Sequence, residues 1–224
     1  MFARNKKKML PIINRGTWTR VHAIRQVLLR FIKANAGANQ KVNVVSLGAG
    51  YDSTYFWLRQ HHGITDATLD YIELDFSDVI KKKLQTIKSQ DALKKLVWGE
   101  EATTFGNREG SCLSDNELDA PGYKLIAGDV RDADIMKGKL TGTNVDGSLP
   151  TLIITECILI YMRADDTHGV LRWTKEYFGE QGDLAYLNYE MINPDDQFGR
   201  MMVENLENRG CQLLGIHDCP SLDA

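Results

Sequence analysis

Short apolar runs, separated by polar or glycine-containing segments, recur along the whole chain. They lie at residues 42–47, 69–76, 123–128, 151–162 and 184–190. Runs of this length, with little alternation between apolar and polar positions, are typical of strands buried on both faces in a parallel sheet. The chain therefore predicts five strands of a mostly parallel sheet.

Apolar residues at helical spacing lie between these runs. Within residues 11–33 they recur from Trp18 to Ile32 and predict an amphipathic helix, with Thr17 as a candidate N-cap. Further helices are predicted after the candidate caps Asp52 and Ser53, from near Ser77, over 165–178 and over 198–208. Because helical segments alternate with strands, we expect an α/β fold with helices on both faces of the sheet.

Several segments show neither the apolar runs of buried strands nor the helical spacing of apolar residues. Residues 99–122 are polar and glycine-rich, so we expect a surface excursion or an irregular hairpin there. Residues 138–148 predict a polar linker, and the lysines at 81–83 predict a solvated helix face. A basic run within residues 1–10 predicts a disordered tail. With 224 residues, the chain suits one domain that spans its whole length.

Composition narrows the class of protein. The chain is 43% hydrophobic and 25% charged, with a formal net charge of −3, so charge gives no argument for nucleic acid or an anionic membrane as a partner. No apolar run has the length of a membrane-spanning helix. The four cysteines are scattered, and we expect Cys157 to be a small buried hydrophobe. Neither a metal site nor a disulfide framework is expected, and the default location is cytoplasmic.

A glycine loop follows the first predicted strand, in the sequence VNVVSLGAGYD at residues 42–52. Gly48 and Gly50 allow a sharp turn and a close approach of the backbone to a ligand. A strand, glycine loop and helix form the opening unit of nucleoside-binding α/β folds. Ser53 replaces the third glycine of the dinucleotide fingerprint, and Asp52 would repel a pyrophosphate. S-adenosylmethionine, a nucleoside without phosphate, suits this loop; the alternative is a turn that only satisfies chain geometry.

Acidic residues follow two further predicted strands. Glu73 and Asp75 compete for the position after the second strand, where an acid accepts hydrogen bonds from ribose hydroxyls. Asp129 follows the third strand, where it either accepts from the amine of an adenine or caps the next helix. These side chains predict the nucleoside half of a binding site.

Glu156 lies within an otherwise apolar run, and an unpaired buried carboxylate costs several kcal/mol. We expect it in the crevice beside the first strand, facing a cation. Arg20, near the start of the first helix, is either a surface charge or a guanidinium that binds a carboxylate.

Several motifs together resemble those of the leucine carboxyl methyltransferases. They are INRG at 13–16, RVH at 20–22, LGAGYDST at 47–54, ELD at 73–75, TEC at 155–157, YM at 161–162 and NYE at 188–190. The resemblance implies a Rossmann-like fold and an S-adenosylmethionine-dependent enzyme. Such an enzyme methyl-esterifies the C-terminal leucine of type-2A protein phosphatase catalytic subunits, whose C-terminal tail would be the partner.

The resemblance also implies roles for individual residues. The family's cofactor contacts correspond to Arg20, Gly48, Asp75, Asp129, Val130 and Glu156. Gly50 lies in the same loop as Gly48. At the end of the second strand, the family pattern favours Asp75 over Glu73. Arg20 and Tyr161 are the candidate catalytic residues, and Asn188 and Tyr189 are candidate walls for the peptide tail. Arg20 would hold either the methionine carboxylate or the substrate carboxylate.

Two features depart from the family pattern. Family members carry a segment upstream of the position of residue 13, and this segment includes a lysine that contacts the cofactor. Residues 1–10 do not match it. The family sheet has seven strands, and we expect this chain to lack the last two. The alternatives are a tRNA wybutosine-modifying relative, a non-catalytic binding protein and a nicotinamide-dependent dehydrogenase.

Overall fold

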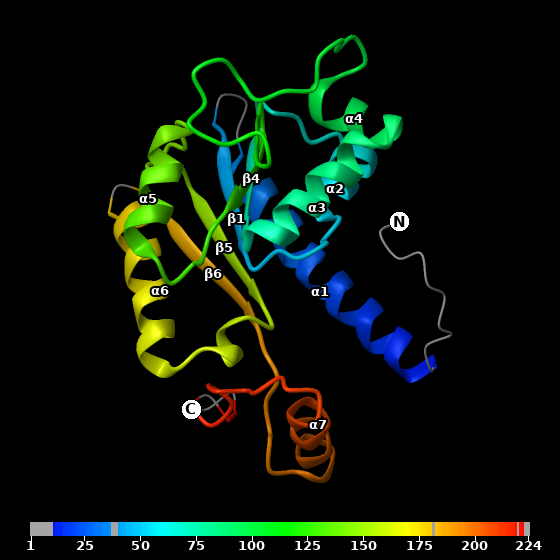
Figure 1. Cartoon of the computed structure of the whole chain (residues 1–224), viewed down its shortest axis with the longest axis vertical. Coiled ribbons are helices and arrows are strands. Elements are labelled where there is room, and N and C mark those ends of the chain that lie inside the picture. The colour runs from blue at the N-terminus through cyan, green and yellow to red at the C-terminus, as the bar shows by residue number, and fades with distance from the viewer. Residues whose placement is uncertain (1–10, 37–39, 181, 219, 222–224) are drawn as a thin grey trace.

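A six-stranded sheet forms the centre of the computed structural model (Figure 1), which describes residues 11–36, 40–180, 182–218 and 220–221. The expected tail at 1–10 lies outside these residues. The strand order is β3-β4-β2-β1-β5-β6, and only the β3–β4 pair is antiparallel. The strands are β1 (Val42–Leu47), β2 (Leu69–Asp75), β3 (Leu118–Ala120), β4 (Tyr123–Ala127), β5 (Thr151–Glu156) and β6 (Leu184–Tyr189).

Helices cover both faces of this sheet (Figure 1). One face carries α1 (Pro11–Asn35), α2 (Thr54–His62), α3 (Ser77–Lys88) and α4 (Asp91–Trp98), and the other carries α5 (Ala133–Gly142) and α6 (Ala164–Phe178). The 3-10 helix η1 (Leu159–Tyr161) and α7 (Gln197–Glu207) pack in a smaller cluster with residues 213–216. The expected α/β fold is confirmed. Within the described ranges, no helix combines the length and apolarity that crossing a membrane requires.

Two hydrophobic cores lie on opposite faces of the sheet, because successive strand residues point to opposite sides. In β1, which is buried along its whole length, Val44 belongs to the core under α1 to α4, whereas Val45 belongs to the core under α5 and α6. Leu28 of α1 and Trp173 of α6 are among the buried side chains that cover these two faces. The uninterrupted apolar run at 42–47 is explained by this burial on both sides.

The order of the strands creates a switch point at β1. The chain leaves β1 to pair β2 on one side and returns later to pair β5 on the other, with Leu47 opposite both Leu74 and Thr155. Because β1, β2, β4 and β5 are parallel, their C-terminal ends meet at one edge of the sheet. Open α/β sheets bind ligands at such a point.

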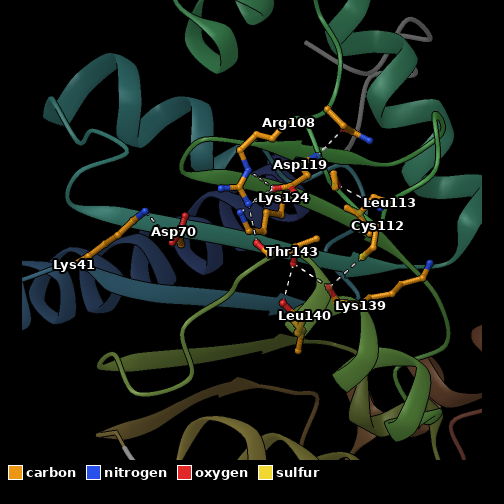
Figure 2. Close-up of polar contacts among 12 residues, drawn as sticks. Lys41, Asp70, Arg108, Cys112, Leu113, Asp119, Lys124, Lys139, Leu140 and Thr143 are labelled. Atoms are coloured by element: carbon orange, nitrogen blue, oxygen red, sulfur yellow. Dashed lines mark hydrogen bonds and ion pairs between the residues drawn. The ribbon is translucent and has the colours of Figure 1, made fainter.

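Residues 99–122 contain the strand that the sequence did not predict, β3, which forms a hairpin with β4 through Gly122 (φ +72°). A buried polar network supports it (Figure 2): Asp119 accepts hydrogen bonds from Arg108 Nε at 3.2 Å and from Lys124 Nζ at 3.1 Å. Arg108 Nη2 also donates to the Thr143 carbonyl at 2.8 Å, which joins the hairpin to the end of α5. Residues 99–117 form a largely exposed stretch without regular secondary structure, and residues 118–120 form the hairpin, so each of the two expectations holds for part of the segment.

Three local expectations were wrong in whole or in part, and one helix was missed. Helix α1 already begins at Pro11, so Thr17 lies inside it and caps nothing. Helix α5 extends into the expected linker and ends at Gly142. Of the three lysines expected on a solvated face, Lys81 and Lys82 are exposed, but Lys83 is fully buried. Helix α4 was not predicted, although Asp91 begins it and its apolar residues pack against α3.

Candidate active site

The loop after β1 requires glycine at two positions. Gly48 and Gly50 have φ values of +63° and +55°, a region that residues with a Cβ rarely adopt. A Cβ on Gly48 would also meet the side chain of Ile158, which packs directly over it. Gly50 N–H donates to Asp75 Oδ2 at 2.6 Å, so the loop is fixed to the end of β2. The loop therefore keeps backbone close to the switch point.

Two cavities lie beside this loop and share Gly48. The first, of about 370 Å³, is called here the Arg20 pocket, and its lining includes Arg20, Arg25, Gly48, Asp52, Tyr71 and Glu156. The second, of about 340 Å³, is called the Asp75 pocket, and its lining includes Gly48, Asp75, Phe76, Asp129, Val130 and Tyr161. Each volume lies at the lower end of the range for small-molecule sites, about 300–1,000 Å³. The pair therefore forms an extended candidate site across the end of β1.

The Arg20 pocket contains charges of both signs. Arg20 Nε lies 2.7 Å from Glu156 Oε1, and each side chain keeps about a third of its surface exposed, 35% and 31%. This contact is an ion pair without hydrogen-bond alignment, since the buried Nε has no hydrogen-bond partner among the described residues. Burial raises the pKa of Glu156, Arg20 opposes the rise, and Asp52 adds to it. Glu156 therefore pairs with Arg20 of the protein itself, and its contact with a cation of a ligand stays a prediction.

The turn that follows β5 is unusual. Cys157 has φ +53°, a left-handed conformation that is uncommon for a residue other than glycine, asparagine or aspartate. Its N–H donates to the Tyr189 carbonyl at 2.8 Å, and its thiol receives a long contact of 3.9 Å from Arg20 Nη1. Cys157 is half-buried and lines the Asp75 pocket, so it is not the buried core residue that was expected.

The Asp75 pocket carries the acids that follow β2 and β4. Asp75 lies at its wall, and its Oδ1 accepts from the Phe76 N–H at 2.7 Å. Asp129 pairs with Arg131 at 2.5 Å, and the hydrogen bond from this guanidinium lowers the pKa of Asp129. The alternative role of Asp129 as a helix cap was wrong, because the residue before α5 is Asp132. Its contact to an adenine amine stays a prediction.

Glu73 does not reach the site. It is fully buried between the sheet and α3, where Lys83 forms an ion pair with it and the Tyr123 hydroxyl donates to Oε1 at 3.0 Å. Burial raises the pKa of Glu73 to about 7, against the opposing charge of Lys83. A side chain committed to these partners lines neither pocket. The expectation that Glu73 binds a ligand was therefore wrong, and Asp75 is the acid that β2 presents.

The candidate walls of a peptide site lie at the end of η1 and β6. Tyr161 is 37% exposed at the Asp75 pocket, and burial, together with the nearby Cys211 thiol, raises its pKa. The Arg20 guanidinium lies 6.0 Å from the Tyr189 ring centroid. Asn188 Oδ1 accepts from the Thr155 hydroxyl at 2.9 Å. The catalytic role of Tyr161 and the wall roles of Asn188 and Tyr189 stay predictions.

Two residues of the site were missed from the sequence. Glu190 Oε1 accepts the N–H groups of Ile158 and Leu159 at 3.0 and 2.9 Å, and so holds the turn that carries Glu156. Arg25 adds a second guanidinium to the Arg20 pocket. An acid at the end of the last predicted strand, and an arginine on the same helix as Arg20, were the available signals. Neither distinguishes a site residue from a surface charge without the position of α1.

The fold and the site define a class. A parallel sheet with a glycine loop at its switch point, and acids at the ends of β2, β4 and β5, is the arrangement of a methyltransferase-type α/β protein. The sequence model of the leucine carboxyl methyltransferase family matches residues 2–175, and the chain belongs to this family.

Relatives with this name align along almost the whole chain. The leucine carboxyl methyltransferase 1 homolog of Arabidopsis thaliana is 36% identical over 222 residues, which cover 99% of this chain and 62% of the relative. Leucine carboxyl methyltransferase 1 of Rattus norvegicus is 33% identical over 221 residues, with coverages of 99% and 62%. The Debaryomyces hansenii protein of the same name is 34% identical over 225 residues and is covered to 58%. The chain thus spans about three fifths of the length of these relatives.

Proposed function

We propose that the chain binds S-adenosylmethionine across the two pockets and transfers its methyl group to a carboxylate. The proposed acceptor is the C-terminal leucine of a type-2A protein phosphatase catalytic subunit. Membership of the leucine carboxyl methyltransferase family supports the carboxylate as the acceptor. The observation that carries the proposal is the charge pattern of the Arg20 pocket.

The residues present fit this cofactor. An α-amino acid group is a zwitterion, and the Arg20 pocket offers guanidinium groups from Arg20 and Arg25 beside carboxylates of Asp52 and Glu156. The buried Arg20 Nε pairs with Glu156 but makes no aligned hydrogen bond among the described residues, so its N–H can donate to a ligand oxygen. The Asp75 pocket combines acids with apolar side chains, a lining that suits a ribose and a flat base. The lack of a phosphate on this ligand also avoids repulsion from Asp52.

The reaction asks the protein for positioning and not for proton transfer. When bound, S-adenosylmethionine supplies a methyl group on a sulfonium that a nucleophile attacks in line. A C-terminal carboxylate, with a free pKa of about 3.5, is already ionised at neutral pH. Glu156 lines the Arg20 pocket, Asp75 and Asp129 line the Asp75 pocket, and Gly48 lines both, so the methyl group would lie near Gly48. Such an arrangement contributes orientation and exclusion of water.

Transfer of a radiolabelled methyl group tests the proposal. The acceptors are a phosphatase tail peptide that ends in a free leucine carboxylate, the same peptide with a C-terminal amide, and unmodified tRNA. We expect label only in the free-acid peptide. Label in the tRNA would contradict the acceptor, and binding of the cofactor without transfer to any acceptor would favour a non-catalytic binding protein instead. Calorimetry with S-adenosylmethionine and with a nicotinamide cofactor distinguishes this proposal from a dehydrogenase.

A further inference from the structure

An open groove adjoins the Asp75 pocket on the side of Asp129. It has a volume of about 520 Å³ and is called here the Glu117 groove, and its lining includes Phe76, Ser77, Asn116, Glu117, Asp129 and Lys139. It shares Phe76, Gly128 and Asp129 with the Asp75 pocket. Ser77 and Asn116 are exposed. The nucleoside end of the candidate site therefore opens into a second, larger space beside Asp129.

The charged side chains of the Glu117 groove are already paired with each other. Buried Glu117 accepts at Oε1 from the Ala127 N–H at 2.8 Å and from Lys139 Nζ at 2.7 Å. Its Oε2 accepts from the Ser114 hydroxyl at 2.8 Å, and Lys139 also donates to the Ala127 carbonyl at 2.7 Å. Because the carboxylate and the ammonium balance each other, the groove suits a neutral group better than a charged one.

Asp129 already accepts most of the hydrogen bonds that a carboxylate can accept. Arg131 donates to it from three N–H groups, with Nε at 2.9 Å, Nη2 at 2.5 Å and the backbone N at 3.0 Å from a carboxylate oxygen. An ionised carboxylate accepts about four hydrogen bonds. Asp129 therefore has room for one N–H of an adenine amine, and the second N–H of that amine gains nothing from this carboxylate.

Phe76 lies at the border between the Asp75 pocket and the Glu117 groove and is 59% exposed, so its ring can stack on a flat base. We propose that the site binds adenosine ligands with one neutral substituent on the exocyclic amine, and that this substituent lies in the Glu117 groove. This inference rests on the proposed function and deepens it, because it defines which derivatives of the nucleoside the site admits. The substituted amine keeps one N–H for Asp129, and the carbon replaces the N–H that Asp129 does not bind.

Three ligands that differ only at the adenine amine provide the test. S-adenosylhomocysteine has two amine N–H groups, its derivative with one benzyl group on the amine has one, and its derivative with two methyl groups there has none. Isothermal titration with the full chain should show that the benzyl derivative binds less than about tenfold more weakly than S-adenosylhomocysteine. The dimethyl derivative should bind about tenfold more weakly or worse, because Asp129 loses the one N–H that it accepts, and a hydrogen bond to a charged group contributes about this factor.

Two substitutions place bulk in the Glu117 groove and leave the Asp75 pocket intact. Asn116→Trp and Ser77→Trp replace exposed residues that line the groove but not the pocket. Each should weaken binding of the benzyl derivative by about tenfold or more and leave S-adenosylhomocysteine within about twofold. Asp134→Trp is the matched control, because it places the same bulk in a separate hollow that also borders Asp129, and it should leave both ligands within about twofold.

Several outcomes would overturn this inference while the proposed function stands. With S-adenosylhomocysteine bound, a loss of about tenfold or more for the benzyl derivative would show that the site encloses the amine. Equal binding of the dimethyl derivative would show that Asp129 accepts no N–H from the ligand. If neither groove variant weakens the benzyl derivative, or if Asp134→Trp alone does, the substituent lies outside the Glu117 groove.

Failure of the proposed function gives a different result. If the unmodified protein does not bind S-adenosylhomocysteine at all, the proposed cofactor is wrong, and this inference fails with it. Circular dichroism of each variant before titration confirms that the compared proteins are folded.

Discussion

Gly48→Ala is the substitution whose consequences the structure defines most closely. Gly48 has φ +63°, and a Cβ built there would overlap Ile158 Cδ1 and lie 3.1 Å from Cγ1 and 3.3 Å from Cβ of the same residue. More than the flexible end of Ile158 is therefore in the way. The variant should lose stability through backbone strain and through packing, and the displaced loop or Ile158 should narrow both pockets.

Gly50→Ala separates these two contributions. Gly50 has φ +55°, so alanine there meets similar strain, but nothing lies within 4 Å of its Cβ. A left-handed residue with a Cβ costs about 1–2 kcal/mol, and overpacking adds about 1–3 kcal/mol. We therefore expect a loss of about 1–2 kcal/mol for Gly50→Ala and about 2–5 kcal/mol for Gly48→Ala. For a chain of this size, each kcal/mol lowers the melting temperature by about 2–4 °C.

Urea and thermal unfolding of both variants provide the assay, with Gly48→Ala/Ile158→Val as the rescue. Valine removes Cδ1, the atom that a Cβ on Gly48 would approach most closely, at a cost of about 0.5–1.5 kcal/mol on its own. The double variant should be more stable than the sum of its parts predicts, which a double-mutant cycle measures. Equal losses for the two glycine variants, or no coupling with Ile158, would refute the reasoning.

The other predictions concern charges. Glu156→Gln should weaken binding of S-adenosylhomocysteine about tenfold or more, measured by calorimetry, because a charged partner for its ammonium is removed. Lys83→Met should lower the free energy of unfolding by about 3–5 kcal/mol in urea, because Glu73 is left buried without its cation. Asp119→Ala should be comparably destabilising in the same assay, since Lys124 is then buried without its carboxylate. The contribution of Glu73 to stability should fall as pH rises from its ordinary pKa of 4.5 to about 7.

The sign of the pH effect follows from proton counts. Between these two pKa values the folded protein keeps the Glu73 proton that the unfolded chain has released, so raising the pH favours unfolding. Urea unfolding at about pH 5 and about pH 8 measures this effect, and Glu73→Gln/Lys83→Met should remove it. An unchanged pH dependence in that double variant would contradict the assignment.

Exposed residues supply matched controls for the charge variants. Glu204→Gln, Lys82→Met and Asp134→Ala make the same changes on the surface, and each should alter stability by less than about 0.5 kcal/mol. A loss in Lys82→Met as large as that in Lys83→Met would show that burial of the pair is not the cause. A normal affinity in Glu156→Gln would remove Glu156 from the candidate site.

The sheet was largely predictable because β1, β2, β4 and β5 are buried on both faces and are therefore apolar runs. β6 was predicted from a similar run, although its residues are half-buried or exposed. β3 was not predictable, since its three residues include Asp119, and only the distant Arg108 and Lys124 make burial of that carboxylate acceptable. The same reason explains Lys83, whose partner Glu73 belongs to another element. Sequence patterns predict well which apolar side chains are buried, but they do not predict which charged side chains form ion pairs.

The residues of the candidate site were likewise predictable only in part. Asp75, Asp129 and Glu156 were predictable as a group, because each lies at or just after the C-terminal end of a strand, and the parallel strands of one sheet end at one edge. The pairing of Arg20 with Glu156 depends on where α1 crosses that edge, and local spacing does not contain this information. Arg25 was missed for the same reason, although it belongs to the same helix.

The turn after β5 shows how the edge strand β6 supports the candidate site. Cys157 is held in a left-handed conformation whose cost is about 1–3 kcal/mol. Bonds from the N–H groups of Cys157, Ile158 and Leu159 to Tyr189 and Glu190 oppose it, each contributing about 0.5–1.5 kcal/mol. These contributions are similar in size, so the direction of the Glu156 side chain depends on the end of β6 as much as on β5 itself. A residue of the candidate site is thus positioned by a strand that lines neither pocket.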